Sequence, residues 1–480
     1  MHHRLKTTAK VTINLQIMTI NRGNYWRITK ISVFLQSHYE QLLNYNMNKM
    51  NRTWIVAVAV MCCTVLEAKQ IAQASKSPKK ASKAIVDGIS YALNAKDNKA
   101  KVVAAKDLYT GDITIPNKFT EDSVTYYVEE IDGGAFRDCA SLTSITIPTT
   151  VAKIGAGAFE NCSALTSISL PSSIIELPFN IFSGCTALTD VELPSSIMEI
   201  GHGAFKKCSA LEKIELPNNV KSLPYHAFLG CTSLKDVTLP KFLEKIGYSA
   251  FQDCSSLEEI ELPSSVKAIG WVAFKNCTSL RRFAFTTSMD NIANSIFEGC
   301  TNLEEVYIPT SITSITHDAF KGCTNLESIT LPNSIKNIGS SAFEDCSNLK
   351  FINIPNGIKE IPSYCFKNCG SLTDITIPTS VKSIANQAFH GCSSMEVIDI
   401  PNSVKELGGD VFEKCSSLMT VFVRSGTPPK IKKDTFPKSL LKEGILFVPN
   451  PTPYRSDPKN PWSQFSEIKA IARDNTRERY

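Results

Sequence analysis

Apolar residues recur along this chain in a unit of 23 residues that is repeated without insertion. In the unit that starts at Leu142, Ile145 and Ile147 alternate with polar residues, which is the period of a strand with one buried face. Pro148 then ends the strand, because proline has no N–H to donate to a neighbouring strand. Ile154 is expected to point inward along the return path of the unit.

Cysteine and phenylalanine mark the same period. A phenylalanine stands three residues before each cysteine of a series spaced 23 residues apart. The cysteines of the series are Cys139, Cys162, Cys185, Cys208, Cys231, Cys254, Cys277, Cys300, Cys323, Cys346, Cys369, Cys392 and Cys415. One unit cannot bury its apolar positions alone, so the units must stack as coils that cover one another. The sequence therefore predicts one repeat solenoid of 13 coils with one long parallel sheet, in place of the roughly two to four globular domains that length alone suggests.

The cysteine column is predicted to hold free thiols. Equivalent Cβ atoms in stacked coils lie about 4.8 Å apart, whereas a disulfide places them about 3.8 Å apart. We therefore expect buried thiols that act as small apolar fillers, with Cys365 as a further filler in another column. No Cys/His spacing of the zinc type occurs, so neither a metal nor a cofactor is expected.

The chain begins with a basic leader. Residues 1–74 contain nine Lys or Arg and two Asp or Glu, whereas the whole chain has a net charge of +5. The remaining residues are therefore close to neutral, and their charge does not favour binding of nucleic acid. The apolar run 54–66, the basic residues before it and Ala72-Gln73-Ala74 after it predict a signal peptide over 47–74. Residues 1–46 are then an over-extended gene prediction, and 75–83 a polar linker. An uncut signal anchor is the alternative.

The repeat resembles the leucine-rich-repeat family, specifically its BspA-like bacterial surface subgroup. The resemblance rests on Ile147-Pro148 at the strand end, on the I-G-x-x-A-F segment Ile154–Phe159, and on the C-x-x-L link that begins at Cys162. It covers residues 131–423 and implies a leucine-rich-repeat, right-handed β-solenoid. The usual Asn/Cys ladder position holds mostly serine, as at Ser173, Ser196 and Ser265, so a ladder of hydroxyl groups is expected.

Both ends of the repeat are expected to be caps, since terminal coils must shield their open faces. Residues 84–130 form a predicted β-rich N-terminal cap, with a hairpin at Ile89–Val103 and a degenerate repeat strand at Gly111–Pro116. Residues 424–480 form a predicted irregular C-terminal cap, in which Phe436 lies one residue out of register.

The resemblance implies a secreted or cell-surface protein on the outer face of a bacterial envelope. Its partners would be proteins, such as extracellular-matrix or host surface proteins or other cells, with membrane contact only through the leader. No catalytic motif comes with the family. Three alternatives stay open: a structural surface-layer component, a carbohydrate-active solenoid enzyme, and a strand face whose carboxylates bind calcium.

The predicted binding residues alternate with the buried strand positions and face the open side of the sheet. Three columns on this face hold fourteen acidic and five basic residues, which favours basic partner surfaces. The predicted protein-binding residues are Asp190, Glu192, Glu215, Asp236, Glu259, Glu261, Arg282, Glu305, Tyr307 and Phe351. The aromatic residues suit contact anchors. Alternatively, the charges are only solvated or pair with each other along a column.

Catalysis is not expected from the remaining chemistry. The four histidines after the leader, His202, His226, His317 and His390, lie on predicted turns away from the acidic face. The nucleophile-elbow, metalloprotease and phosphate-loop motifs are missing from the sequence.

Overall fold

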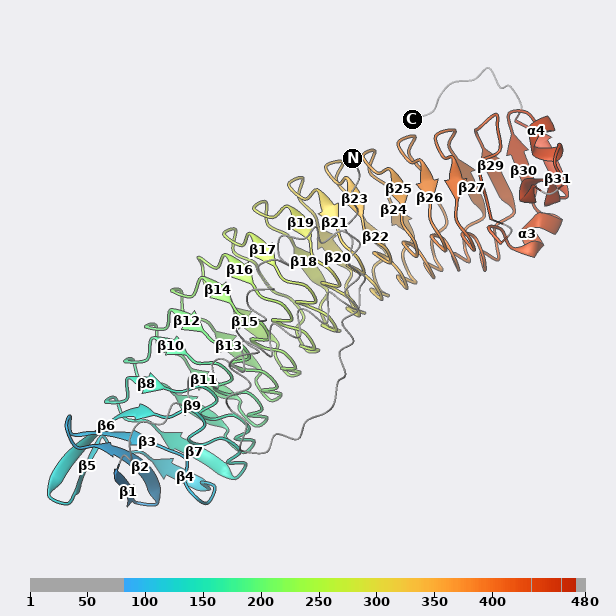
Figure 1. The fold of residues 1–480 in the computed structure, drawn as a ribbon. Helices are drawn as coiled ribbons and strands as arrows, with labels where there is room; N and C mark the ends of the chain where they lie inside the picture. The colour runs from blue at the N-terminus through green and yellow to red at the C-terminus, as the bar shows by residue number, and fades with distance from the viewer. Residues whose placement is uncertain (1–81, 433, 459, 472–480) are drawn as a thin grey trace, which may run out of the picture. The chain divides into compact units, whose positions relative to one another are not determined.

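The computed structural model describes residues 82–432, 434–458 and 460–471. These residues form a β-solenoid of stacked coils (Figure 1), as the repeat predicts. The predicted signal peptide, the extension before it and most of the predicted linker lie outside the described residues.

Most coils contribute two short strands, one from each side. The open-face strands, which contain the equivalents of Ile145, are β7 (Leu142–Thr146), β9 (Ser167–Ser169), β11 (Asp190–Glu192), β13 (Lys213–Glu215), β15 (Asp236–Thr238), β18 (Arg282–Ala284), β20 (Glu305–Tyr307), β22 (Ser328–Ile329), β24 (Phe351–Ile352), β27 (Val397–Ile400) and β29 (Thr420–Val423). Their pairing is parallel and in register, for example Asp190 opposite Ser167. The hydrogen-bonded ladders are shorter than the single long sheet predicted, because residues 258–262 and 373–377 form no strand and the other strands pair in short groups.

A second row of strands occupies the return path, where the sequence predicted only an inward-pointing residue. The second-row strands are β8 (Lys153–Ile154), β10 (Glu176–Leu177), β12 (Glu199–Ile200), β14 (Ser222–Leu223), β16 (Lys245–Ile246), β17 (Ala268–Ile269), β19 (Asn291–Ile292), β21 (Ser314–Ile315), β23 (Asn337–Ile338), β25 (Glu360–Ile361), β26 (Ser383–Ile384) and β28 (Glu406–Leu407). They too pair in parallel between coils. Two residues are too few for a period to be read from sequence, so stacking alone reveals this row.

The third side of each coil is a series of turns bonded to the next coil. The Phe159 N–H donates to the Ile181 carbonyl at 3.1 Å, and the Asn161 N–H donates to the Ser183 carbonyl at 2.7 Å. Asn161 has a φ of 63°, a left-handed conformation that asparagine tolerates better than most residues. Gly155 is needed for a different reason, since a Cβ there would lie 2.2 Å from the Gly133 nitrogen of the preceding coil.

The core consists of aligned columns of side chains. The phenylalanine rings from Phe136 to Phe436 stack coil on coil, with neighbouring centroids 5.3–6.0 Å apart and planes within 28°. All fourteen cysteines among the described residues are free and buried, which confirms the prediction of unbridged thiols.

The thiols also make hydrogen bonds that the sequence did not predict. From Cys162 to Cys415, each Sγ of the column donates to the carbonyl oxygen of the phenylalanine 26 residues earlier, at 3.0–3.3 Å. Burial raises the pKa of Cys185 and of Cys231 to about 12, so these thiols keep their protons. The column therefore fills space and links neighbouring coils as well.

The expected hydroxyl ladder forms in part. Ser196 Oγ donates to the Ile174 carbonyl at 2.6 Å, and Ser265 Oγ donates to the Leu243 carbonyl at 2.7 Å. Ser173 donates in the same way to Val151. The hydroxyls of three other serines in the column are buried without a partner, namely Ser311, Ser380 and Ser403.

Both ends of the solenoid are covered by non-repeat structure. At the N-terminal end, β1 (Ser82–Val86), β2 (Ile89–Asn94), β3 (Lys99–Val102), β6 (Val124–Ile131) and β5 (Lys118–Glu121) form a sheet in that order, and β6 pairs with β8. β2 and β3 form the predicted hairpin, and β4 (Gly111–Thr114) pairs with β7 as the predicted degenerate strand.

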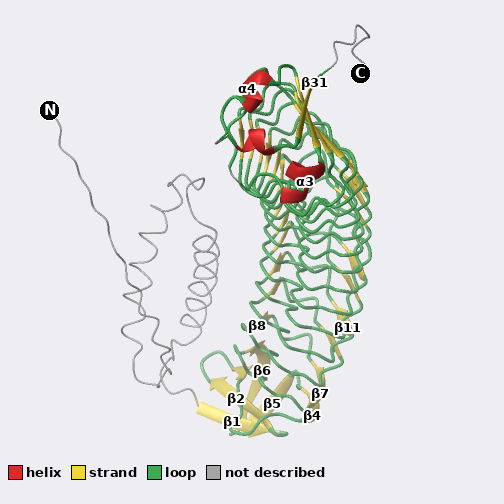
Figure 2. Ribbon diagram, turned by 90° about the vertical axis from the view of Figure 1, so that its right-hand side faces the viewer, coloured by secondary structure: helices red, strands yellow, loops and turns green. Residues whose placement is uncertain are grey.

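At the C-terminal end, β30 (Ile445–Val448) and β31 (Glu467–Ala470) extend the open-face row in parallel beyond β29. Figure 2 shows the short helices α3 (Lys438–Glu443) and α4 (Thr452–Arg455) at this end, together with a 3-10 helix at Pro461–Gln464. Trp462 is fully buried and its ring centroid lies 5.1 Å from that of Phe436, so aromatic packing closes the core.

Candidate functional site

All ten predicted binding residues have exposed side chains on the open-face side of the coils. Alternation explains this placement, since the buried or half-buried isoleucine or valine between two of them packs against the core. Glu259 and Glu261 lie on the coil at 258–262 that forms no strand, and the other eight lie on open-face strands.

Every basic residue of the three columns except Lys213 pairs with an acid one coil away. The N–O distances are 3.4 Å for Lys235–Glu212, 3.9 Å for Arg281–Glu304, 3.7 Å for Arg282–Glu305 and 3.0 Å for Lys350–Glu327. These pairs are exposed, so each contributes at most about 1 kcal/mol. Arg282 and Glu305 are therefore partly neutralised, as the alternative interpretation of the charges expected.

Seven of the remaining acids of these columns gather in one part of the face. We name them the acidic segment: Asp190, Glu192, Glu215, Asp236, Glu258, Glu259 and Glu261, none of which forms an ion pair within the described residues. Only Lys213 interrupts it as an unpaired base. The segment concentrates negative potential on a few successive coils, where self-repulsion opposes folding and a basic partner would relieve it.

Two of the predicted aromatic anchors are well exposed. Tyr307 and Phe351 each have 62% of their surface accessible, and two coil steps separate the strands that carry them. Phe422, at the far end of the same face, is partly covered, since its ring centroid lies 4.8 Å from that of Phe447 and Arg424 lies 5.1 Å above it. Tyr307 and Phe351 are therefore more accessible than Phe422.

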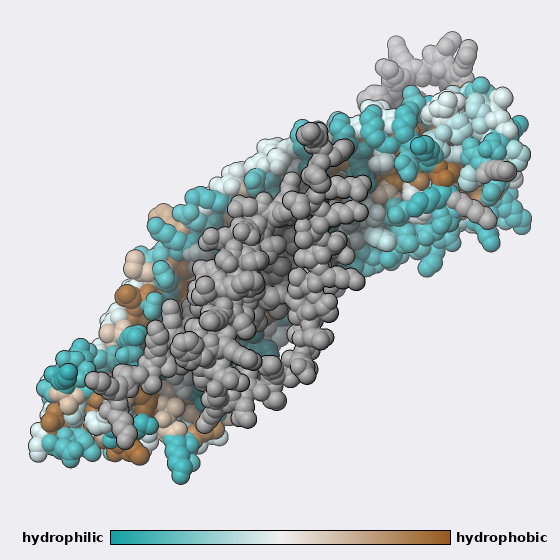
Figure 3. Space-filling model, viewed as in Figure 1, coloured by the Kyte–Doolittle hydropathy of each residue, from teal (hydrophilic) through white to brown (hydrophobic). Residues whose placement is uncertain are grey.

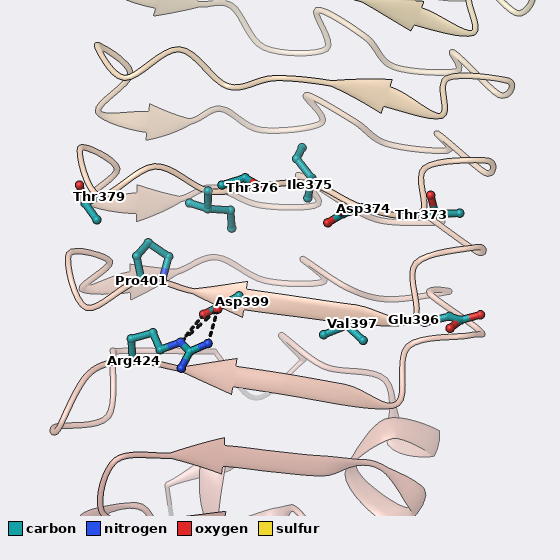
Figure 4. A pocket seen from close by; sticks show the side chains of 11 residues that line it. Thr373, Asp374, Ile375, Thr376, Thr379, Glu396, Val397, Asp399, Pro401 and Arg424 are labelled. Carbon is teal, nitrogen blue, oxygen red and sulfur yellow. Dashed lines mark hydrogen bonds and ion pairs between the residues drawn. The ribbon is translucent and has the colours of Figure 1, made fainter. Parts of the chain in front are cut away.

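The open face also contains a groove that the sequence did not predict. It has a volume of about 780 Å³ (Figure 4). Its lining comes from the strandless coil at 373–377 with Thr379, from β27 with Glu396 and Pro401 on either side of it, and from Arg424. Arg424 Nε and Nη2 donate to the two carboxylate oxygens of Asp399 at 2.9 and 2.6 Å. Asp374 and Glu396 also line the groove, and neither forms an ion pair with another described residue.

One sequence signal marks this groove in retrospect. Arg424 occupies the column of Pro148, where almost every other coil has a strand-ending proline. Unlike proline it has an N–H, which donates to the Ile400 carbonyl at 2.9 Å, while its side chain reaches Asp399. The missing strand at 373–377 has no such signal, because its sequence fits the repeat.

The described site consists of exposed acidic, basic and aromatic side chains. The described residues contain no group of three or more His, Cys, Asp or Glu residues placed to hold a metal ion. The histidines lie on turns, where His202 Nδ1 accepts from the Tyr225 N–H at 3.2 Å and His317 Nδ1 from the Ser340 N–H at 3.0 Å. Burial lowers the pKa of His226 to about 4.

The described part of the chain holds no helix that combines the length and the apolar character needed to cross a bilayer.

Comparisons with known proteins agree on the repeat. The family model for the BspA type leucine rich repeat region matches six copies, over residues 116–235, 199–327 and 313–442. A leucine-rich repeat protein from Bacteroides ovatus is 31% identical, with a TM-score of 0.73 over 81% of this chain and 99% of that protein. A leucine rich cell surface protein from Faecalibacterium prausnitzii is 30% identical, with a TM-score of 0.53 over 73% and 96%. No curated protein sequence matches the chain.

Proposed function

Because the chain belongs to the BspA-type leucine-rich-repeat family, as its motifs predicted, we propose that it is a secreted or cell-surface protein that binds other proteins in adhesion. The acidic segment is the observation that carries the proposal. Seven exposed carboxylates without ion pairs lie on the regular open-face side of successive coils. Such an arrangement costs stability and provides a surface that a basic partner neutralises.

The proposed partner is an extracellular-matrix or host surface protein with a basic contact patch. The acidic segment would speed its encounter and orient it, because complementary potentials act mainly on association and specificity. Tyr307 and Phe351 would then supply the apolar contacts that hold the complex, since exposed aromatic residues are common binding anchors. The groove beside Thr373–Ile377 would accept a basic side chain next to Asp374 and Glu396.

In this proposal the chain acts by binding alone, without catalysis or a cofactor. The competing enzyme interpretation predicts turnover on a panel of glycans and loss of that turnover when one carboxylate is removed. The competing surface-layer interpretation predicts self-assembly of the purified chain without any ligand.

The decisive experiment measures binding of the purified chain to a panel of immobilised matrix proteins. The test variant combines Glu192→Lys, Glu215→Lys, Glu259→Lys and Glu261→Lys. The control variant combines the same reversal at Glu176, Glu199, Glu360 and Glu406, which are equally exposed but lie on second-row strands. We expect the test variant to lose about tenfold or more in affinity, mainly through slower association, while the control binds like the unmodified protein. Equal binding by the test variant would remove the acidic segment from the proposal.

A further inference from the structure

A column of lysines runs along the outer side of the second-row strands in the C-terminal coils. Lys336, Lys359, Lys382, Lys405 and Lys430 are all exposed, and we call them the lysine ridge. The Lys382, Lys405 and Lys430 N–H groups donate to the carbonyls of Lys359, Lys382 and Lys405 at 2.7, 2.8 and 2.9 Å. The backbone therefore holds these lysines in register, one coil step apart.

Within the part of the chain that the structure describes, no acidic residue forms an ion pair with the ridge. Glu360 and Glu406 stand in the adjacent column, yet neither forms an ion pair with any of the five lysines. Like charges opposite each other on paired strands are destabilising, so the ridge lowers the stability of the coils that carry it. An unfavourable arrangement repeated over consecutive coils indicates a function other than folding.

In earlier coils the same column does not hold a continuous run of lysines. Lys267 pairs with Glu244 at 2.9 Å, and Asp290 follows one coil later. Still earlier, Ile175 and Met198 occupy the column and are 58% and 60% exposed. Figure 3 shows hydrophobic patches beside β10–β16 and a surface over the C-terminal coils that is mostly hydrophilic. The run of unpaired positive charge is thus confined to the C-terminal coils.

The residues beside the ridge are polar and free of aromatic rings. Asn333, Asn356 and Asn402 are exposed on one side of it, and Asn337 and Ser383 alternate with Glu360 and Glu406 on the other. Amide and hydroxyl groups suit the hydroxyls of sugars. Binding of single-stranded nucleic acid instead needs aromatic rings on which bases stack, and the flanking columns of these coils provide none.

The geometry points to a linear polysaccharide with an anionic group on successive sugars as the ligand of the lysine ridge. One coil step at strand spacing is about 4.8 Å, close to the length of one sugar residue in an extended chain. Each lysine can therefore meet one sulfate or carboxylate as a point charge. The ridge lies next to the second-row strands, apart from the open face, so the inference is independent of the function proposed above.

Binding of the full chain to immobilised heparin, measured at several salt concentrations, tests the inference. At about 0.7 counterions released per contact, four contacts predict a roughly 50-fold loss of affinity between about 50 and 200 mM salt. The test variant replaces Lys359, Lys382, Lys405 and Lys430 by Gln, and we expect it to bind about tenfold more weakly or worse. The control variant replaces Lys153, Lys221, Lys245 and Lys267 by Gln, which removes the same charge from exposed positions of earlier coils.

Each outcome decides the inference. Loss confined to the test variant, with both variants folded by circular dichroism, supports it. Equal loss in both variants would show attraction by net charge only and would overturn it, as would unchanged binding by the test variant. Tighter binding of single-stranded DNA than of heparin, with the same dependence on the four lysines, would replace the polysaccharide by a nucleic acid.

Discussion

Removing one ring from the phenylalanine column tests the physical basis of the fold. In Phe251→Ala the deleted ring is fully buried, and its centroid lies 5.3 Å from that of Phe228 and 5.4 Å from that of Phe274. Replacing a buried phenylalanine by alanine costs about 3–5 kcal/mol, including the cavity. The two lost stacking contacts account for about 1–3 kcal/mol of that cost, at about 0.5–1.5 kcal/mol for each pair.

The location of the damage follows from the solenoid. Each coil contacts only its neighbours, so Phe251→Ala weakens two coil interfaces near the middle of the stack and leaves the others unchanged. We expect urea unfolding to show a lower midpoint and a broader or split transition. Hydrogen exchange should be fastest in the coils around residue 251. Phe242→Ala is the control, because Phe242 is 59% exposed and should change the unfolding free energy by less than about 0.5 kcal/mol. A loss below about 1 kcal/mol in Phe251→Ala, or uniform exchange along the chain, would refute the idea of a tightly packed column of locally coupled coils.

Two further predictions concern buried polar groups. Burial raises the pKa of Cys185 and Cys231 to about 12 in the folded state, so the unfolded chain loses these protons at lower pH than the folded chain does. The unfolding free energy should therefore fall as pH rises from about 9 to 12, by about 1.4 kcal/mol per pH unit for each thiol. An unfolding free energy that stays constant in urea titrations at alkaline pH would contradict the burial of the thiols. Ser196→Ala should lower the free energy of unfolding by about 1 kcal/mol, because it removes a 2.6 Å hydrogen bond. Ser403→Ala should leave the free energy of unfolding unchanged or raise it, because the Ser403 hydroxyl is buried without a partner among the described residues. Equal losses in chemical unfolding would show that the hydroxyl ladder is not a source of stability.

The position of the open face could be predicted from sequence, and its electrostatics could not. Asp190 and Glu192 alternate with Val191, so their side chains point away from the core regardless of the arrangement of the neighbouring coils. Whether a charged side chain forms an ion pair depends on distances between coils. These distances divide the face into a part with ion pairs and a part without them. Glu305 pairs with Arg282 at 3.7 Å, whereas Glu192 forms no ion pair with any base that the structure describes. The groove depends on a missing strand at residues 373–377, whose sequence fits the repeat like any other.

The unbroken 23-residue period alone determined that the chain stacks, because such a unit has too little interior to be stable without neighbours. The same period determined that the cysteines stay unbridged, since parallel Cβ positions one coil apart are too distant for a disulfide. Only the tertiary structure decided that each thiol donates to a phenylalanine carbonyl, that the return path forms a second row of strands, and that the C-terminal lysines align without acidic partners. These features depend on contacts between residues 22–26 positions apart, and those contacts exist only when one coil lies on the next.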